Sequence, residues 1–137
     1  LGAAWDIAGG FSYADMRTLR SNDAEEIGKQ WASTPRWRAS LWVNHHLHAG
    51  LSVGAGARWS GSAFGDSANS FRTPAYLVFD AALRYDLGLI DASLRGLEGT
   101  INVQNLFDKN YVSSCNYAFG CYYGRARTVS AGVTYRW

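Results

Sequence analysis

The chain has 137 residues, a length that suits one domain, and 47% of them are hydrophobic, which is enough to build a core. Only 18% are charged, below the roughly 25% of ordinary soluble domains, whereas 15% are aromatic and 15 residues are glycine. The net charge of +2 is too small, and the 13 basic residues too scattered, to indicate nucleic acid, and we find no apolar run long enough for a transmembrane helix.

Six stretches alternate between apolar and polar side chains, the pattern of a β-strand with two different faces. They cover residues 1–13, 36–48, 51–60, 76–87, a fifth stretch that is clear from 100 but could begin near 92, and 128–137. In the last stretch one face is apolar and ends in two large rings: Val129, Ala131, Val133, Tyr135 and Trp137. About ten tilted residues are also what one strand of a closed barrel needs to cross a bilayer.

Long and short connections alternate along the chain. Polar segments at 15–35, 61–74 and 105–124 are long, the first with a short helical turn expected near Glu25, whereas 49–50 and the region near 89–98 are turns. Outer-membrane barrels have short periplasmic turns, long outer loops and aromatic girdles at both interfaces. We therefore predict an all-β, antiparallel up-and-down transmembrane barrel segment, with a soluble all-β binding domain as the alternative.

Six strands cannot stand alone in lipid, because the two open edges would leave backbone groups unpaired. Bacterial single-chain barrels begin at about eight strands. We therefore expect residues 1–137 to be the C-terminal part of a larger barrel domain, with no plug domain in the chain.

Three stretches resemble the C-terminal end of TonB-dependent outer-membrane receptors. One is Pro35-Arg36 with the strand after it, and a second is Tyr76 with 80–85. The most specific is 102–111, whose family-motif residues are Asn105, Leu106, Phe107, Asp108 and Tyr111. The chain end is similar to the signal read by the barrel assembly machinery, in Gly132, Tyr135 and Trp137, with Trp where Phe is commoner.

Within that family, 114–124 and 61–71 resemble loops of ferrichrome-type hydroxamate siderophore receptors. The resemblance implies a barrel of about 22 strands around an N-terminal plug. It implies uptake of a ferric siderophore, driven by the TonB-ExbB-ExbD complex through that plug, with no enzyme activity. Iron would enter only as the siderophore complex, so no cofactor or metal is bound directly. It also implies the bacterial outer membrane, lipid contact and a periplasmic C-terminus. Another outer-membrane barrel, such as a porin or adhesin, is the alternative.

Cys115 and Cys121 lie in one loop, and an even pair in an oxidising compartment predicts a disulfide. Closing so short a loop stabilises by roughly 2 kcal/mol and stiffens the loop tip. A metal pair is disfavoured, because no third ligand is near. The run His45, His46 and His48 is read as boundary and lumen residues, since alternation puts His45 on the opposite face.

Aromatic residues crowd the loops around the cysteine pair, and exposed rings commonly mark a binding surface. The ligand-binding candidates are Tyr117, Phe119, Tyr122, Tyr123 and Phe71. The alternative is that these rings pack on one another and hold the loops together. Asp80, Arg84 and Asp86 share one strand face and could mimic a catalytic group, but we interpret them as part of a charge-paired lumen wall.

Overall fold

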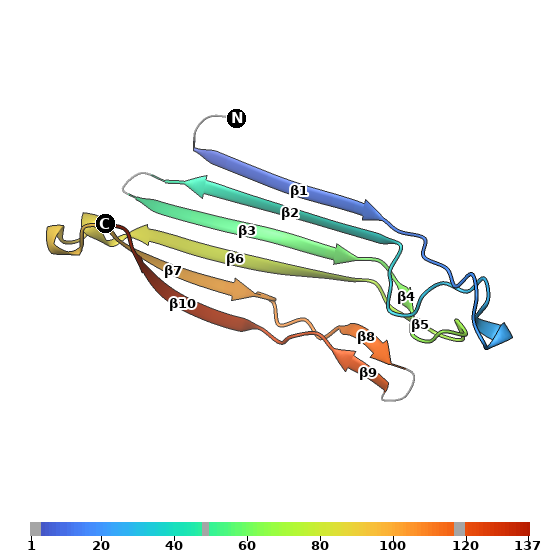
Figure 1. Ribbon diagram of the computed structural model, residues 1–137. Coiled ribbons are helices and arrows are strands. Elements are labelled where there is room, and N and C mark those ends of the chain that lie inside the picture. The colour runs from blue at the N-terminus through green and yellow to red at the C-terminus, as the bar shows by residue number, and fades with distance from the viewer. Residues whose placement is uncertain (1–3, 48–49, 117–119) are drawn as a thin grey trace.

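Six strands form one antiparallel sheet in the order β1-β2-β3-β6-β7-β10 (Figure 1). The structure is a computed structural model, and it describes residues 4–47, 50–116 and 120–137. Each strand of the sheet lies beside the sheet strands that precede and follow it in the chain, which confirms the predicted up-and-down order. The sheet is open, with β1 and β10 at its edges. The bounds are β1 Trp5–Tyr13, β2 Trp37–His46, β3 Leu51–Ser60, β6 Tyr76–Asp86, β7 Leu97–Gln104 and β10 Thr128–Tyr135.

The register gathers most apolar side chains of the sheet on one face, with Trp42 and Val78 on the other. Odd-numbered residues oppose odd-numbered residues in every pairing of the six-stranded sheet, for example Ala39 with Trp59 and Ala57 with Phe79. A slip by one residue would turn a whole strand over, so this parity carries the predicted alternation across the sheet. The face is exposed, with Phe11 at 69% and Val133 at 66%.

Very little apolar surface is buried. Within the described ranges, Val78 and Ala63 are the buried hydrophobic residues, at 1% and 6% exposure. A water-soluble domain would instead bury its apolar face in a core, and a patch of this extent needs an apolar partner. The geometry therefore argues against the soluble all-β alternative and for a sheet that faces lipid.

The short-turn end differs from prediction. The fifth strand begins at Leu97, and a start near residue 92 is wrong, because Ala92–Leu94 is the 3-10 helix η3 and Leu87–Leu89 is the 3-10 helix η2. Both are capped by a carboxylate: Asp86 accepts from the Gly88 amide and Asp91 from the Ser93 amide. These caps favour a helical turn over strand pairing. None of the helices in the described part is long and apolar enough to cross a membrane.

The long-loop end contains structure that alternation did not reveal. The expected helical turn is the 3-10 helix η1, Ala24–Glu26. Two small hairpins were read as irregular loop: β4 Ala63–Phe64 with β5 Arg72–Thr73, and β8 Val112–Asn116 with β9 Gly120–Tyr123. Their strands are too short for alternation to stand out. All of these elements lie at one end of the sheet, and η2, η3 and the C-terminus lie at the other (Figure 1).

The polar face of the sheet is charge-paired, as predicted for a lumen wall. Arg58 Nε lies 2.6 Å from Asp80 Oδ2, and Arg84 Nε lies 3.3 Å from Glu98 Oε1. Asp86 is the cap of η2 and not a partner of Asp80. Each of these charges therefore has a structural role, in the wall or in the turn that follows β6.

Trp42 covers two glycines on this polar face. Its indole Nε1 donates to Asn44 Oδ1 at 2.8 Å, which holds the ring flat against β3. A Cβ on Gly54 would lie 2.7 Å from Trp42 Cζ2, and one on Gly56 would overlap the same ring. The indole can occupy this place only because both positions lack a side chain.

Replacing Gly56 with alanine is expected to lower the free energy of unfolding by about 1 to 3 kcal/mol, because the new methyl group displaces the indole. Gly10→Ala is the control: it is another polar-face glycine, and its Cβ would meet Ser40 Oγ at 3.4 Å. Denaturant melting of the protein folded in detergent measures both. Equal stability of the two variants would contradict the role given to Trp42.

Candidate functional site in the long loops

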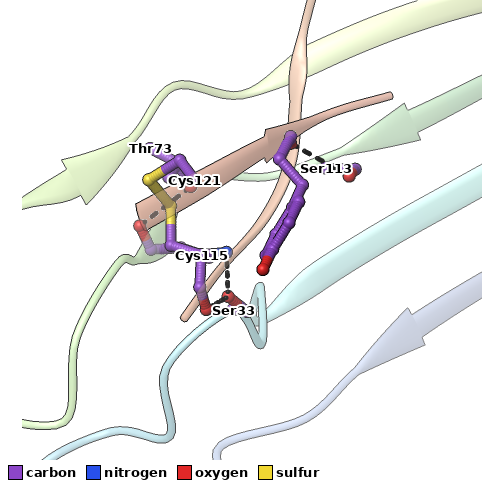
Figure 2. The surroundings of a disulfide bond; sticks show 7 residues. Ser33, Thr73, Ser113, Cys115 and Cys121 are labelled. Carbon is purple, nitrogen blue, oxygen red and sulfur yellow. Dashed lines mark hydrogen bonds between the residues drawn. A yellow bond between two sulfur atoms is a disulfide. The ribbon is translucent and has the colours of Figure 1, made fainter. Parts of the chain in front are cut away.

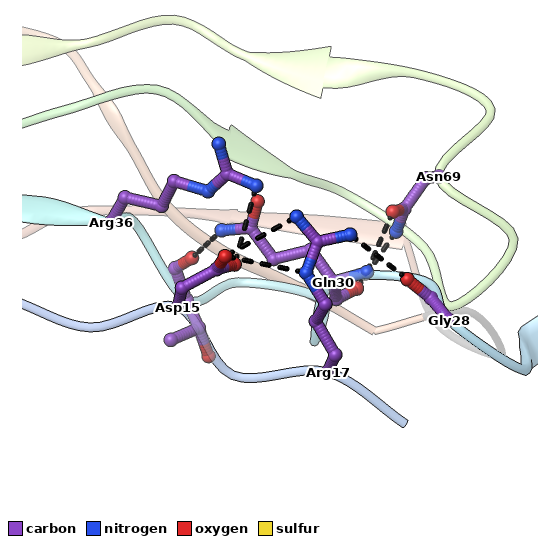
Figure 3. A network of polar contacts seen from close by, with 7 residues as sticks. Asp15, Arg17, Gly28, Gln30, Arg36 and Asn69 are labelled. Carbon is purple, nitrogen blue, oxygen red and sulfur yellow. Dashed lines mark hydrogen bonds and ion pairs between the residues drawn. The ribbon is translucent and has the colours of Figure 1, made fainter. Parts of the chain in front are cut away.

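Three loops meet at one end of the sheet, and we name them loop A (14–36), loop B (61–75) and loop C (105–127). Loops A and B are joined by a reciprocal amide pair. The Gln30 amide donates to Asn69 Oδ1, and Asn69 Nδ2 donates to the Gln30 carbonyl, both at 2.8 Å (Figure 3). Gln30 is 4% exposed and its Nε2 donates to the Thr34 carbonyl at 2.9 Å. Asn69 has a φ of 59°, a conformation that asparagine tolerates well.

Loop A is shaped by a second polar cluster. The Asp15 carboxylate lies 3.2 Å from Arg17 Nη2 and 3.2 Å from Arg36 Nη2 (Figure 3). Arg17 Nη1 also donates to the Gly28 carbonyl at 3.2 Å. These groups are partly exposed, so each ion pair contributes at most about 1 kcal/mol. Their main effect is to fix the path of loop A above β1 and β2.

Asp66 organises the turn of loop B. Its Oδ1 accepts from the Ser70 amide at 2.7 Å, and its Oδ2 accepts from the Ser70 hydroxyl. Asp66 is 6% exposed. The Ser70 hydroxyl, with the Ser70 and Phe71 amides, lowers the pKa of Asp66 below its ordinary value, and burial opposes this shift only in part. The charged form is therefore the one that holds the turn.

Acidification should loosen loop B. Folding lowers the pKa of Asp66, so the charged carboxylate stabilises loop B. This stabilisation is complete above the ordinary aspartate pKa of about 3.9 and is lost as the pH falls through the lowered pKa. The Ser70 amide resonance, followed by NMR, should therefore titrate below pH 3.9. Asp66→Asn is the control, and a Ser70 shift that titrates equally in that variant would contradict the assignment.

Ser33 is the residue at which all three loops meet. Its amide donates to the Phe64 carbonyl of loop B at 2.7 Å. Its hydroxyl donates to the Cys115 carbonyl at 3.0 Å and accepts from the Cys115 amide at 2.7 Å (Figure 2). Ser33 itself belongs to loop A and has a φ of 56°, which is uncommon outside glycine.

The predicted disulfide is present. Cys115 and Cys121 are bonded to each other and lie opposite in the β8–β9 hairpin. Among the residues that the structure describes, no group of three or more His, Cys, Asp or Glu could hold a metal ion. His48 lies outside the described residues. His45 stacks on Trp5 on the apolar face at 3.9 Å, whereas His46 contacts Asp6 on the polar face, as alternation predicted.

Asn105 is a buried structural lock. It is 2% exposed and has a φ of 51°. Its Nδ2 donates to the carbonyls of Lys109 and Arg125, and its Oδ1 accepts from the Lys109 amide, all at 2.9 Å. Its own amide donates to Asp80 Oδ1 at 2.9 Å. The side chain of Asn105 thus joins Lys109 and Arg125 within loop C, and its backbone amide ties the start of the loop to β6.

The motif residues that follow Asn105 also hold loop C to the sheet. Asp108 Oδ1 accepts from the Arg127 amide at 2.7 Å, which fixes the entry to β10. The Leu106 amide donates to the Phe79 carbonyl at 2.7 Å, and the Phe107 ring packs edge-on against the Phe79 ring at 5.4 Å. The Tyr111 ring packs at a tilt against the Tyr76 ring, with 4.2 Å between the ring centroids. The motif therefore shapes loop C, a role that its residue types did not reveal.

Three of the five ligand candidates are exposed residues of the loops. Tyr122 and Tyr123 are 50% and 74% exposed on β9, and Phe71 is 46% exposed in loop B. Phe71 also packs against Gly65, where a Cβ would overlap its ring. Tyr117 and Phe119 lie outside the described residues. Contact of these five residues with a ligand stays a prediction.

Sequence reasoning missed Trp31. Its ring is 54% exposed in loop A. It lines an open pocket of about 250 Å³ between loops A and B, together with Thr18, Gln30, Ala32 and Ser67. A tryptophan alone in a polar loop was the available signal. An exposed ring beside polar groups suits a small polar ligand.

An open, curved sheet with one lipid-type face, a charge-paired polar face and long loops at one end defines a segment of an outer-membrane β-barrel. Residues 1–106 match the family model described as TonB dependent receptor-like, beta-barrel. The chain therefore belongs to the TonB-dependent receptor β-barrel family. This family consists of receptors and transporters, not enzymes, and it replaces the porin and adhesin alternative.

Named relatives cover nearly the whole chain. It is 37% identical over 140 residues to the ferrichrome outer membrane transporter/phage receptor of Escherichia coli, covering 99% of this chain and 18% of that protein. It is 37% identical over 129 residues to the ferrioxamine receptor of Yersinia enterocolitica, covering 94% of this chain and 18% of that protein. The closed-form crystal structure of the ferric-catecholate import receptor Fiu of E. coli matches with a TM-score of 0.75 and 30% identity, over 97% of this chain and 19% of that one. The chain thus spans about a fifth of these proteins.

Proposed function

We propose that the chain is the C-terminal barrel segment of a TonB-dependent outer-membrane receptor that takes up a ferric hydroxamate siderophore. The observation that carries the ligand class is the 37% identity to both a ferrichrome transporter and a ferrioxamine receptor. Ferrichrome and ferrioxamine are hydroxamates. The likeness to a catecholate receptor makes a ferric catecholate the second candidate.

In this proposal, the polar face of the sheet lines the lumen. Pairs such as Arg58 with Asp80 keep that wall hydrated but nearly neutral. The rest of the receptor supplies the remaining strands and the plug, through which the TonB-ExbB-ExbD complex drives transport. Iron enters as part of the siderophore ligand, not as a cofactor of the protein.

The same proposal orients the chain. Loops A, B and C face the outside, and the C-terminus, with η2 and η3, faces the periplasm (Figure 1). Short periplasmic turns and long outer loops are the rule for these barrels, which supports that direction. The exposed rings of Tyr122, Tyr123 and Phe71 then face arriving ligand. Tyr117 and Phe119 stay predicted contacts that lie outside the described residues.

Transport of radioactive iron tests the function. The full-length receptor is expressed in an iron-starved strain that lacks other siderophore receptors, and ferrichrome or a ferric catecholate is supplied. We expect uptake from ferrichrome that disappears when TonB is deleted. Uptake from the catecholate alone would overturn the hydroxamate assignment, and uptake from neither would overturn the siderophore assignment.

A further inference from the structure

Ser33 joins three loops through three hydrogen bonds, and it is not itself one of the candidate ligand contacts. Its backbone amide binds loop B at Phe64, and its hydroxyl binds the backbone of Cys115 in loop C from both sides. The hydroxyl oxygen accepts one hydrogen bond and donates another, so both of its roles are used. No alanine or glycine could replace this function.

The backbone of Ser33 is held in an uncommon conformation. Its φ of 56° lies in the left-handed region, where a residue other than glycine carries a local cost. Such a conformation persists when surrounding contacts determine it, and here they are the Phe64 and Cys115 hydrogen bonds. The strained residue therefore marks a place where the loops are held together.

The partner of the Ser33 hydroxyl is one half of the disulfide. Cys115 is bonded to Cys121, and Tyr122 and Tyr123 follow directly on β9. On the other side, Phe64 pairs with Arg72, the residue after Phe71. Ser33 thus connects the hairpin that carries Tyr122 and Tyr123 with the strand pair next to Phe71, and Figure 2 shows its side chain directed at Cys115.

We propose that Ser33 is a positioning residue that locks the disulfide hairpin of loop C to loops A and B and thereby sets the affinity of the ligand site. The effect of this lock on ligand affinity rests on the proposed function. The disulfide acts through this contact. It fixes the Cys115 backbone within the hairpin, and the Ser33 hydrogen bonds fix loop A relative to that backbone.

Amide hydrogen exchange tests the lock without any ligand. In the full-length receptor, Ser33→Gly removes the hydroxyl and relieves the strained φ, whereas Ser33→Ala removes the hydroxyl but keeps a side chain. Both variants should speed exchange of the Cys115 amide about tenfold, because each loses one hydrogen bond to that amide and a tenfold change corresponds to about 1.4 kcal/mol. Ser113→Ala is the matched control, because that hydroxyl donates to the Tyr122 carbonyl within the same hairpin. Unchanged exchange in both Ser33 variants, or an equal increase in Ser113→Ala, would overturn the proposal.

Binding of ferrichrome then tests the consequence. Ser33→Gly should weaken binding, and the same change should have little further effect when Cys115 and Cys121 are both replaced by serine, because coupled positions are not additive. If the losses of affinity from Ser33→Gly and from the cysteine replacements simply add, the disulfide does not act through Ser33 and the proposal is wrong. If the unaltered receptor binds no ferric siderophore, the proposed function fails, whereas the exchange result still decides the lock.

Discussion

Replacing Asn105 with alanine should lower the free energy of unfolding by about 4 kcal/mol, the largest effect of any single substitution considered. The change deletes three side-chain hydrogen bonds and leaves the Lys109 amide and the carbonyls of Lys109 and Arg125 without that partner. Because the site is 2% exposed, water cannot easily replace the lost amide. Denaturant melting of the receptor in detergent measures the loss.

Two variants separate the causes. Asn102→Ala makes the same substitution at an exposed position of β7, the strand that ends just before Asn105, and should change stability by less than about 0.5 kcal/mol. Asn105→Gly suits the φ of 51° yet still lacks the amide, so it should lose nearly as much as alanine. If glycine restores stability, the backbone conformation and not hydrogen bonding explains the role of Asn105.

The membrane-facing sheet could be predicted because its information is local. A period of two along each strand shows which face is apolar. Because odd-numbered residues pair with odd-numbered residues throughout the six-stranded sheet, that face then extends across all six strands. Trp59 could be placed on the apolar face from its position in β3 alone, and the structure pairs it with Ala39. The helices η2 and η3 could not be placed this way, because their caps at Asp86 and Asp91 compete with strand pairing.

The loop architecture could be predicted only in part, because its contacts join residues far apart in the chain. The disulfide was predictable, since both cysteines lie in one loop. The contact of Ser33 with Cys115 spans 82 residues, and nothing in the residues near Ser33 indicates it. The Asn105 motif carried a family resemblance, but its action as a lock depends on Asp80, in another strand, and on Arg125, 20 residues further along the chain.

Removing the side chain of Trp137 is expected to reduce the amount of receptor in the outer membrane at least several-fold while leaving the folded protein almost equally stable. Trp137 is fully exposed, and its described ring contact is with Tyr135 at 6.2 Å. A side chain that buries nothing contributes little to folding, so a substitution there should shift stability by less than about 0.5 kcal/mol. We therefore propose that its value lies in recognition by the assembly machinery, together with Gly132 and Tyr135.

Quantifying the Trp137→Ala variant in isolated outer membranes, and melting the same variant after refolding in detergent, separates assembly from stability. Trp31→Ala is the matched control, because it removes another exposed indole, 54% exposed, that lies in loop A and outside the signal. We expect normal membrane levels for Trp31→Ala and low levels for Trp137→Ala. Normal levels of both would show that the C-terminal ring is not read during assembly. A large loss of stability on refolding would instead show that Trp137 packs against the strand that completes the barrel beside β10.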